Sequence, residues 1–249
     1  MVKFFRLFFL VSAGVFAINA YAGLQEGVDA IIRSDFATAL KIFHPLAEKG
    51  NVAAQVNLGN LYMKGLGVEQ NYLLARHWYL KAAEQGERIA QSKLGILYYY
   101  GLGIDKDPAE AARWFQKAAE QGETSAQSIL GSLYAAGDGV QKNLSLALYW
   151  YTMAEERGDG EAAKGRKSLE EEITPGQRDE ALRLMAETRK LRGEQEAKDF
   201  AKATAGLLAP PGPSAQGDSA KLGQGSTVAA DKRKKHPTKK QTPNQPEKK

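Results

Sequence analysis

The side chains that most often carry out acid–base or metal chemistry are few in this sequence and far apart. The three histidines, His44, His77 and His236, share no short motif, and the chain contains no cysteine. A metal site built from His or Cys needs closely spaced ligands, such as two histidines one helical turn apart. The sequence therefore predicts no metal site, and we interpret the histidines as incidental to function.

Two other segments imitate functional motifs. Residues 160–166 read GEAAKGR, which is similar to a phosphate-binding loop, but Arg166 stands where that loop needs lysine and no strand is expected before it. Glu170, Glu171 and Glu172 form an acidic cluster with no complementary group, so we interpret it as a solvated helix end. The Gly-x-Ser-x-Gly and Ser-x-x-Lys motifs of serine enzymes do not occur. We therefore predict no catalytic residue and no cofactor.

Around these segments the chain repeats itself every 36 residues. A constant period without insertions predicts a stack of identical structural modules. The columns that define the period are Gly50, Gly86, Gly122 and Gly158; Gly59, Gly95 and Gly131; Tyr62, Tyr98 and Tyr134; and Trp78, Trp114 and Trp150.

Each module is predicted to contain two helices. The first runs from about Val52 to Lys64 and ends at Gly65, because glycine readily takes the positive φ of a helix end. The second helix follows a column of capping residues, whose side-chain oxygens can accept the free amide protons of the first turn. These capping residues are Asn71, Asp107 and Asn143.

The apolar residues of the first helix fall on one face. Ala54, Leu58, Leu61 and Tyr62 have the spacing of a single helical stripe, and the later modules repeat it. Gly59 is expected to let the second helix approach closely. The second helix supplies the opposing surface, with Trp114 and Trp150 as the largest buried contributors. One pair cannot bury its own apolar face, whereas stacked pairs share a continuous core.

These columns resemble the Sel1-like repeat, a longer relative of the tetratricopeptide repeat. The matching pattern is A-x-x-x-L-G-x-x-Y-x-x-G-x-G, followed by A-x-x-W-[YF]-x-K-A-A-E-Q-G, over about residues 35–172. The resemblance implies an all-α fold, a right-handed α/α superhelical solenoid of helix pairs. It also implies a bacterial source and a non-enzymatic role in protein binding.

The repeat boundaries divide the chain into segments. Three full repeats are expected at residues 51–86, 87–122 and 123–158, with N-terminal capping helices at 23–50 and a half repeat plus capping helix at 159–202. Residues 28–50 match only the second helix of a repeat. A last helix is predicted to open at Thr174-Pro175 with a capping box to Gln177, to present Ala181, Leu182 and Met185, and to end near Leu191.

The two ends of the chain differ from its middle. Residues 1–22 join two basic residues to an apolar run and end in Ala-Tyr-Ala, which predicts a signal peptide cleaved after Ala22 and a periplasmic or secreted protein. No later segment is apolar enough to cross a membrane. Residues 203–249 hold nine Lys/Arg against three Asp/Glu and many prolines, which predicts a disordered basic tail. Such a tail can attract anionic polymers or membrane surfaces by charge alone.

The resemblance also implies where a partner binds. Arrays of this kind usually hold peptides in a concave groove lined by the first helices. Tyr98 belongs to the structural column, but Tyr99 and Tyr100 do not, and they share a second stripe with Ser92 and Ile96. An alternative role for Tyr99 and Tyr100 is to cover the neighbouring repeat. The predicted groove residues are Asn60, Met63, Lys64, Ser92, Ile96, Tyr99, Tyr100, Ser128 and Ser132.

The function predicted from the sequence is a non-enzymatic scaffold or adaptor in the bacterial envelope, or secreted, which binds a partner protein or peptide. Two alternatives stay open. One is a hydrolase that acts on the cell wall. The other is a binder of anionic polymers through the basic tail, with no specific recognition of nucleic acid.

Overall fold

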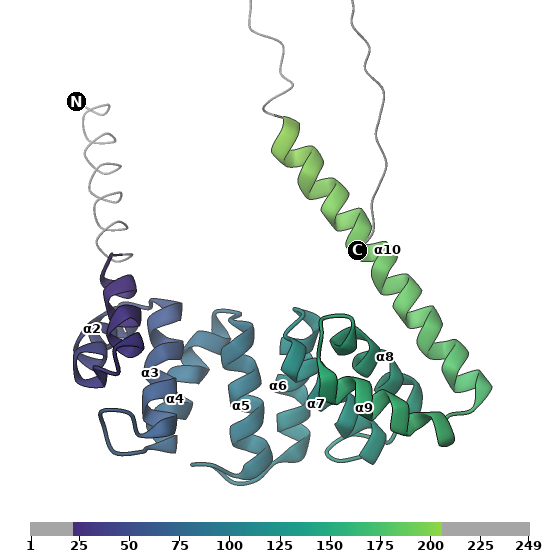
Figure 1. Ribbon diagram of the computed structural model, residues 1–249, viewed down its shortest axis with the longest axis horizontal. Coiled ribbons are helices and arrows are strands. Elements are labelled where there is room, and N and C mark those ends of the chain that lie inside the picture. The colour runs from purple at the N-terminus through teal and green to yellow at the C-terminus, as the bar shows by residue number, and fades with distance from the viewer. Residues whose placement is uncertain (1–21, 206–249) are drawn as a thin grey trace, which may run out of the picture. The chain divides into compact units, whose positions relative to one another are not determined.

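The computed structural model describes residues 22–205, and every regular element in that range is helical (Figure 1). The all-α prediction is therefore confirmed. Residues 22–32 form the first described helix. The helices that follow are α2 (Phe36–Glu48), α3 (Val52–Lys64), α4 (Tyr72–Glu84), α5 (Arg88–Tyr100), α6 (Pro108–Glu120), α7 (Thr124–Ala136), α8 (Leu144–Glu155), α9 (Gly160–Ser168), the short η1 (Leu169–Glu171) and α10 (Pro175–Ala205).

From α2 to α9, each helix packs against the helix before it and the helix after it. The first helices of the repeats are α3, α5, α7 and α9, and the second helices are α4, α6 and α8. The buried apolar residues accordingly form a series of adjoining clusters, each shared by neighbouring helices. This arrangement confirms the predicted solenoid of helix pairs, in which each repeat depends on its neighbours for a buried core.

The helix ends follow the signals in the sequence. The side chains of Asn71, Asp107 and Asn143 each accept a hydrogen bond from the backbone amide three residues later, as predicted. The first helices carry their own caps at Asn51, Glu87, Glu123 and Asp159. Gly65 ends α3 with a φ of 66°, and this left-handed conformation recurs at the ends of α5 and α7.

Each helix pair is closed by an aromatic ring that lies directly against a glycine. A Cβ atom on Gly59 would lie 2.6 Å from a ring carbon of Tyr79, which is closer than any van der Waals contact. Gly95 and Phe115 repeat the arrangement one module later, with 2.8 Å between the same positions. The prediction that this glycine column permits close helix approach is confirmed.

The tryptophan column is less uniform than the sequence suggests. Trp78 and Trp150 are buried, but Trp114 is only half-buried, with Lys117 Nζ 4.0 Å from its ring centroid. The prediction that Trp114 and Trp150 are the largest buried contributors is thus wrong for Trp114. The residues that follow them in the chain, Tyr79 and Phe115, are 0% and 1% exposed and fill the centre of each pair.

Buried glutamines tie successive repeats together. Gln55 Nε2 donates to the carbonyl of Ala47 in the preceding second helix, and Gln55 Oε1 accepts from Gln85. The same two bonds recur one repeat later around Gln91. In the third repeat Arg157 replaces the donor and bonds to the Gly122 carbonyl instead. Leaving a buried polar group unpaired costs free energy, so these bonds favour one register between the modules that they join.

Further helices pack at both ends of the array. The helix at residues 22–32 packs on the second helix of its pair, where a Cβ on Gly27 would lie 2.5 Å from the Phe43 ring. At the other end, Thr174 and Gln177 form the predicted capping box. Ala181 and Met185 are buried, as expected.

The last helix departs from the prediction in two ways. Leu182 is 54% exposed and does not join the buried face of Ala181 and Met185. The helix also continues past Leu191 to Ala205, because residues 192–205 are rich in helix formers and contain no proline. The predicted signal peptide, except Ala22, and the tail beyond Ala205 lie outside the described residues.

The glycine contact makes a direct prediction for stability. Replacing Gly95 with alanine should lower the free energy of unfolding by about 1–3 kcal/mol, because the added methyl group meets the buried Phe115 ring. Urea unfolding followed by circular dichroism measures the change. Gly193, which has nothing within 4 Å of an added Cβ, is the control, and Gly193→Ala should cause no loss. Equal stability of Gly95→Ala and the unchanged protein would contradict the close-contact account.

Candidate functional site

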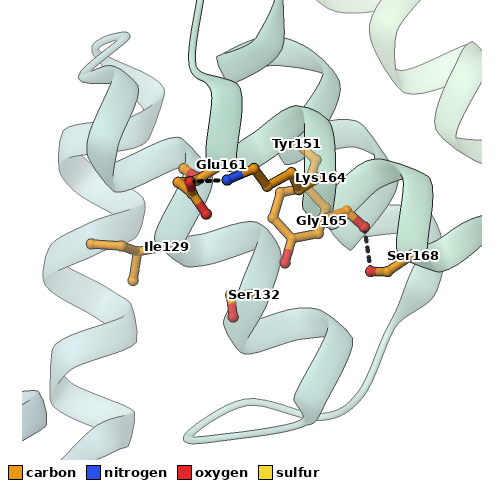
Figure 2. Close-up of a pocket in the computed structure, with 8 residues that line it drawn as sticks. Ile129, Ser132, Tyr151, Glu161, Lys164, Gly165 and Ser168 are labelled. Atoms are coloured by element: carbon orange, nitrogen blue, oxygen red, sulfur yellow. Dashed lines mark hydrogen bonds and ion pairs between the residues drawn. The ribbon is translucent and has the colours of Figure 1, made fainter.

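Two surface pockets lie between successive first helices. The first, which we call the apolar pocket, lies between α3 and α5, and the second, which we call the hydroxyl pocket, lies between α7 and α9 (Figure 2). Their volumes are about 470 and 460 Å³. The apolar pocket is lined by Val52, Ala53, Val56, Asn57, Asn60, Glu87 and Ile89. The hydroxyl pocket is lined by Ser128, Ile129, Ser132, Tyr151, Glu161, Lys164, Gly165 and Ser168.

The two pockets use the same positions of the repeat. Val56 and Asn60 in α3 correspond to Ser128 and Ser132 in α7, two periods later. Because the repeat has constant length, these positions lie on the same side of every first helix. We call this side, which carries both pockets, the first-helix surface.

The predicted groove residues are only partly gathered there. Asn60, Ser128 and Ser132 line the two pockets. Met63 and Ile96 are half-buried against the core clusters, and Lys64 and Tyr100 are exposed at the ends of α3 and α5. Ser92 is 3% exposed, so its side chain adds almost no surface to the predicted stripe.

Tyr99 and Tyr100 have separate environments. Tyr99 packs against the core cluster of the next repeat, and its hydroxyl donates to Asp138 Oδ2 at 2.8 Å. This hydrogen bond raises the pKa of Tyr99. Tyr99 therefore covers the neighbouring repeat, as the alternative interpretation predicts. Tyr100 is 66% exposed and touches Tyr99 edge to face.

The hydroxyl pocket is polar and has both signs of charge at its rim. Lys164 Nζ donates to Glu161 Oε1 at 2.6 Å, and this hydrogen bond raises the pKa of Lys164. Ser168 Oγ donates to the Gly165 carbonyl at 2.7 Å. Figure 2 shows both contacts on the α9 side, with the Tyr151 ring directed across the pocket toward the part of α7 that carries Ser132.

Sequence reasoning missed several lining residues. Two further columns of the first helix also line the pockets. One column holds Ala53 and Ile89, and the other holds Asn57 and Ile129. Tyr151 was missed because it lies on a second helix. The signal that identifies it is its place opposite the glycine column, together with Gly165, which leaves room beside its hydroxyl.

The motifs considered for catalysis have structural partners. His44 and His77 lie edge-on against Trp78, with ring centroids 5.8 and 5.0 Å away. Arg166 pairs with Glu155 rather than facing a phosphate-binding loop. Glu172 in the acidic cluster contacts Lys142. Within residues 22–205, no group of three or more His, Asp or Glu side chains is arranged to hold a metal ion.

In the first repeat, the surface and the core are joined by one hydrogen bond. The Tyr79 hydroxyl donates to Asn60 Oδ1 at 2.7 Å, from a side chain that is fully buried. Burial raises the pKa of Tyr79, so the hydroxyl keeps its proton and acts as the donor. Asn60 thus supplies the hydrogen-bond acceptor for the Tyr79 hydroxyl at the edge of the apolar pocket.

Comparison with protein families finds the Sel1 repeat at residues 15–51, 52–87, 88–123 and 124–159, which together make up more than half of the chain. No curated protein matches the chain.

The solved structures that are similar to this chain include two that cover more than half of it. One is a Sel1 repeat protein from Oxalobacter formigenes, with 41% identity and a TM-score of 0.56, over 58% of this chain and 60% of that one. The other is a protective antigen present in uropathogenic Escherichia coli strains that displays an SLR fold, with 36% identity and a TM-score of 0.59. That match covers 64% of this chain and 35% of the antigen. The present chain therefore matches less than two thirds of the length of either relative.

The Tyr79–Asn60 bond can be tested by a double-mutant cycle. Asn60→Ser should lower the free energy of unfolding by about 1–3 kcal/mol, because it leaves a buried hydroxyl without its acceptor. Adding Tyr79→Phe should recover part of that loss, since Phe115 fills the same column one repeat later. Urea unfolding of the four proteins measures the coupling. A coupling energy of zero would show that the bond does not contribute.

Proposed function

Because the chain belongs to the Sel1 repeat family, whose members generally serve as protein–protein interaction scaffolds, we propose that it binds a partner protein through its first-helix surface. The observation that supports this most strongly is the pair of pockets at equivalent positions of the repeat. A partner segment that follows the repeats would meet an apolar pocket at α3 and α5 and a polar one at α7 and α9.

The apolar pocket supplies the hydrophobic contact that such binding requires. Ile89 is 42% exposed at its edge, beside Val52, Ala53 and Val56. Interfaces gain most of their affinity from a few apolar or aromatic anchors that fill pockets, while the polar rim fixes specificity. We assign the anchoring role to this pocket and the selective role to the hydroxyl pocket.

We further propose that the protein acts in the bacterial envelope or outside the cell. The support is the signal-like sequence of residues 1–22, of which residues 1–21 lie outside the described part of the chain. Among the helices formed by residues 22–205, none has both the length and the apolar character needed to cross a membrane. The cell-wall hydrolase and the anionic-polymer binder remain predictions from the sequence.

If the partner binds through the first-helix surface, a charge introduced on an exposed hydrophobic residue of that surface should weaken binding. The same change on an exposed residue elsewhere should not. A photoreactive residue at position 89 should capture the partner in the bacteria that make the protein, and mass spectrometry identifies it. Ile89→Asp should then weaken binding of the purified partner about tenfold, because a charge replaces an apolar contact worth about 1.5–3 kcal/mol.

The control for this experiment lies on a second helix. Leu73 in α4 is 63% exposed, so Leu73→Asp makes the same chemical change on an exposed residue that lines neither pocket. It should leave the affinity unchanged. Weaker binding with Leu73→Asp and normal binding with Ile89→Asp would move the interface away from the first-helix surface.

Export predicts a defined N-terminus. When the chain is expressed in a bacterium from its first methionine, the protein recovered outside the inner membrane should begin at Gly23, because the small residues Ala20 and Ala22 suit signal peptidase. Intact-mass measurement and N-terminal sequencing check this. Full-length chain that stays in the cytoplasm would contradict the proposed location.

A further inference from the structure

The repeats place an aromatic ring of the second helix against a first-helix glycine three times. In the first and third repeats, this ring also reaches residues of the first-helix surface. In the first repeat the Tyr79 hydroxyl makes this contact, and the carboxamide of Asn60 accepts its hydrogen bond. The fold thus contains its own example of a carboxamide bound at this position.

The second repeat avoids the need for an acceptor. Phe115 has no hydroxyl, and Ile96 replaces the asparagine. Ile96 packs against the core cluster that contains Phe115. The two positions therefore change together, from a polar pair in the first repeat to an apolar pair in the second.

The third repeat keeps the hydroxyl but lacks the carboxamide. Tyr151 returns at the ring position, while Ser132 stands where Asn60 stands in the first repeat. Tyr151 is only 7% exposed, and no residue within 22–205 is hydrogen-bonded to its hydroxyl, although the residue lines the hydroxyl pocket. A serine side chain is too short to replace the amide of asparagine.

Two glycines lie against the Tyr151 ring, and one of them keeps the space around the hydroxyl open. A Cβ on Gly131 would lie 2.7 Å from the Tyr151 ring, and a Cβ on Gly165 would lie 2.4 Å from the ring carbon that bears the hydroxyl. Gly165 stands in the first-helix column that holds Asn57 and Ile129 in earlier repeats. Any side chain there would cover the hydroxyl, so glycine keeps it accessible from the pocket.

We propose that the hydroxyl pocket binds a carboxamide side chain, Asn or Gln, of the partner. This inference rests on the proposed function, since it names the chemistry that the first-helix surface selects. The carboxamide oxygen of the partner accepts from Tyr151, as Asn60 does from Tyr79. The amide NH₂ group has the serine hydroxyls and the Glu161 carboxylate as available acceptors.

The charges around the pocket favour a neutral ligand over a carboxylate. Lys164 is already paired with Glu161 at 2.6 Å. The second carboxylate, Asp159, caps the start of α9, and its Oδ1 atom lies 3.5 Å from Ser128 Oγ. One cation against two carboxylates would repel an acidic side chain, whereas an amide offers the same acceptor geometry without charge.

The test uses random dodecapeptides displayed on phage and selected on the full-length protein. Peptides that bind should contain Asn or Gln, and changing that residue to Met in synthetic copies should weaken binding about three- to tenfold, the value of one hydrogen bond. Tyr151→Phe should have the same effect. This variant should fold, because Phe115 occupies the equivalent position.

Ser132→Asn is the variant that tests occupancy of the pocket most directly. It restores the arrangement of the first repeat, so the introduced amide should bond to Tyr151, fill the pocket and weaken the selected peptides at least about tenfold. The melting temperature should not fall, which separates blocking from unfolding. Ala136→Asn, one turn later at the exposed end of α7, is the matched control and should bind as the unchanged protein does.

Two results would overturn the assignment. Selected peptides with Asp or Glu in place of Asn or Gln would assign the pocket to carboxylates. Peptides that bind Ser132→Asn as well as the unchanged protein, or whose Gln-to-Met copies lose nothing, would show that the partner amide is not recognised there. If those same peptides are weakened by Ile89→Asp, the proposed function stands and only the carboxamide inference fails. If Ser132→Asn weakens them and Ile89→Asp does not, the carboxamide inference stands and the apolar pocket loses its proposed anchoring role.

Discussion

The contact between a glycine and an aromatic ring determines the geometry of the whole array. Because Gly59 and its equivalents have no side chain, the ring of the second helix can lie against the backbone of the first. This contact sets the separation of the two helices, buries the rings of Tyr79 and Phe115 and repeats at a constant interval. The hydroxyl of Tyr79 meets Asn60 at the edge of one pocket, and Tyr151 lines the other, so the choice between Tyr and Phe in the core affects the pockets.

The positions of the repeat therefore fall into two groups with different physical constraints. The glycine, alanine, leucine and glutamine columns contact the neighbouring helix, and their size and hydrogen bonds are restricted by packing. The side chains of the first-helix columns that line the pockets pack against other residues on one side only, so their size and polarity are less restricted. Val56 and Ser128 occupy the same position, yet one contributes to an apolar pocket and the other to a polar one. This freedom allows one scaffold to present different surfaces along its length.

Much of the fold could be predicted from the sequence because its signals are local and repeated. The bounds of α3 and the caps at Asn71, Asp107 and Asn143 follow from glycines and short polar side chains that act within one helical turn. The site was harder to predict, because exposure depends on the neighbouring helix. Ser92 and Ser128 are equivalent in sequence, but Ser92 is buried and Ser128 lines a pocket. Tyr151 reaches the surface from a second helix, which a helical stripe drawn on the first helix cannot reveal.

The central claim is that the repeat places the Tyr151 hydroxyl where the Tyr79 hydroxyl lies, with the acceptor missing. The crystal structure of the Ser132→Asn variant tests it most directly. The account predicts that the introduced amide oxygen lies within hydrogen-bond distance of the Tyr151 hydroxyl, as Asn60 does at 2.7 Å from Tyr79. An amide turned into solvent, with the Tyr151 hydroxyl bonded elsewhere, would contradict the account.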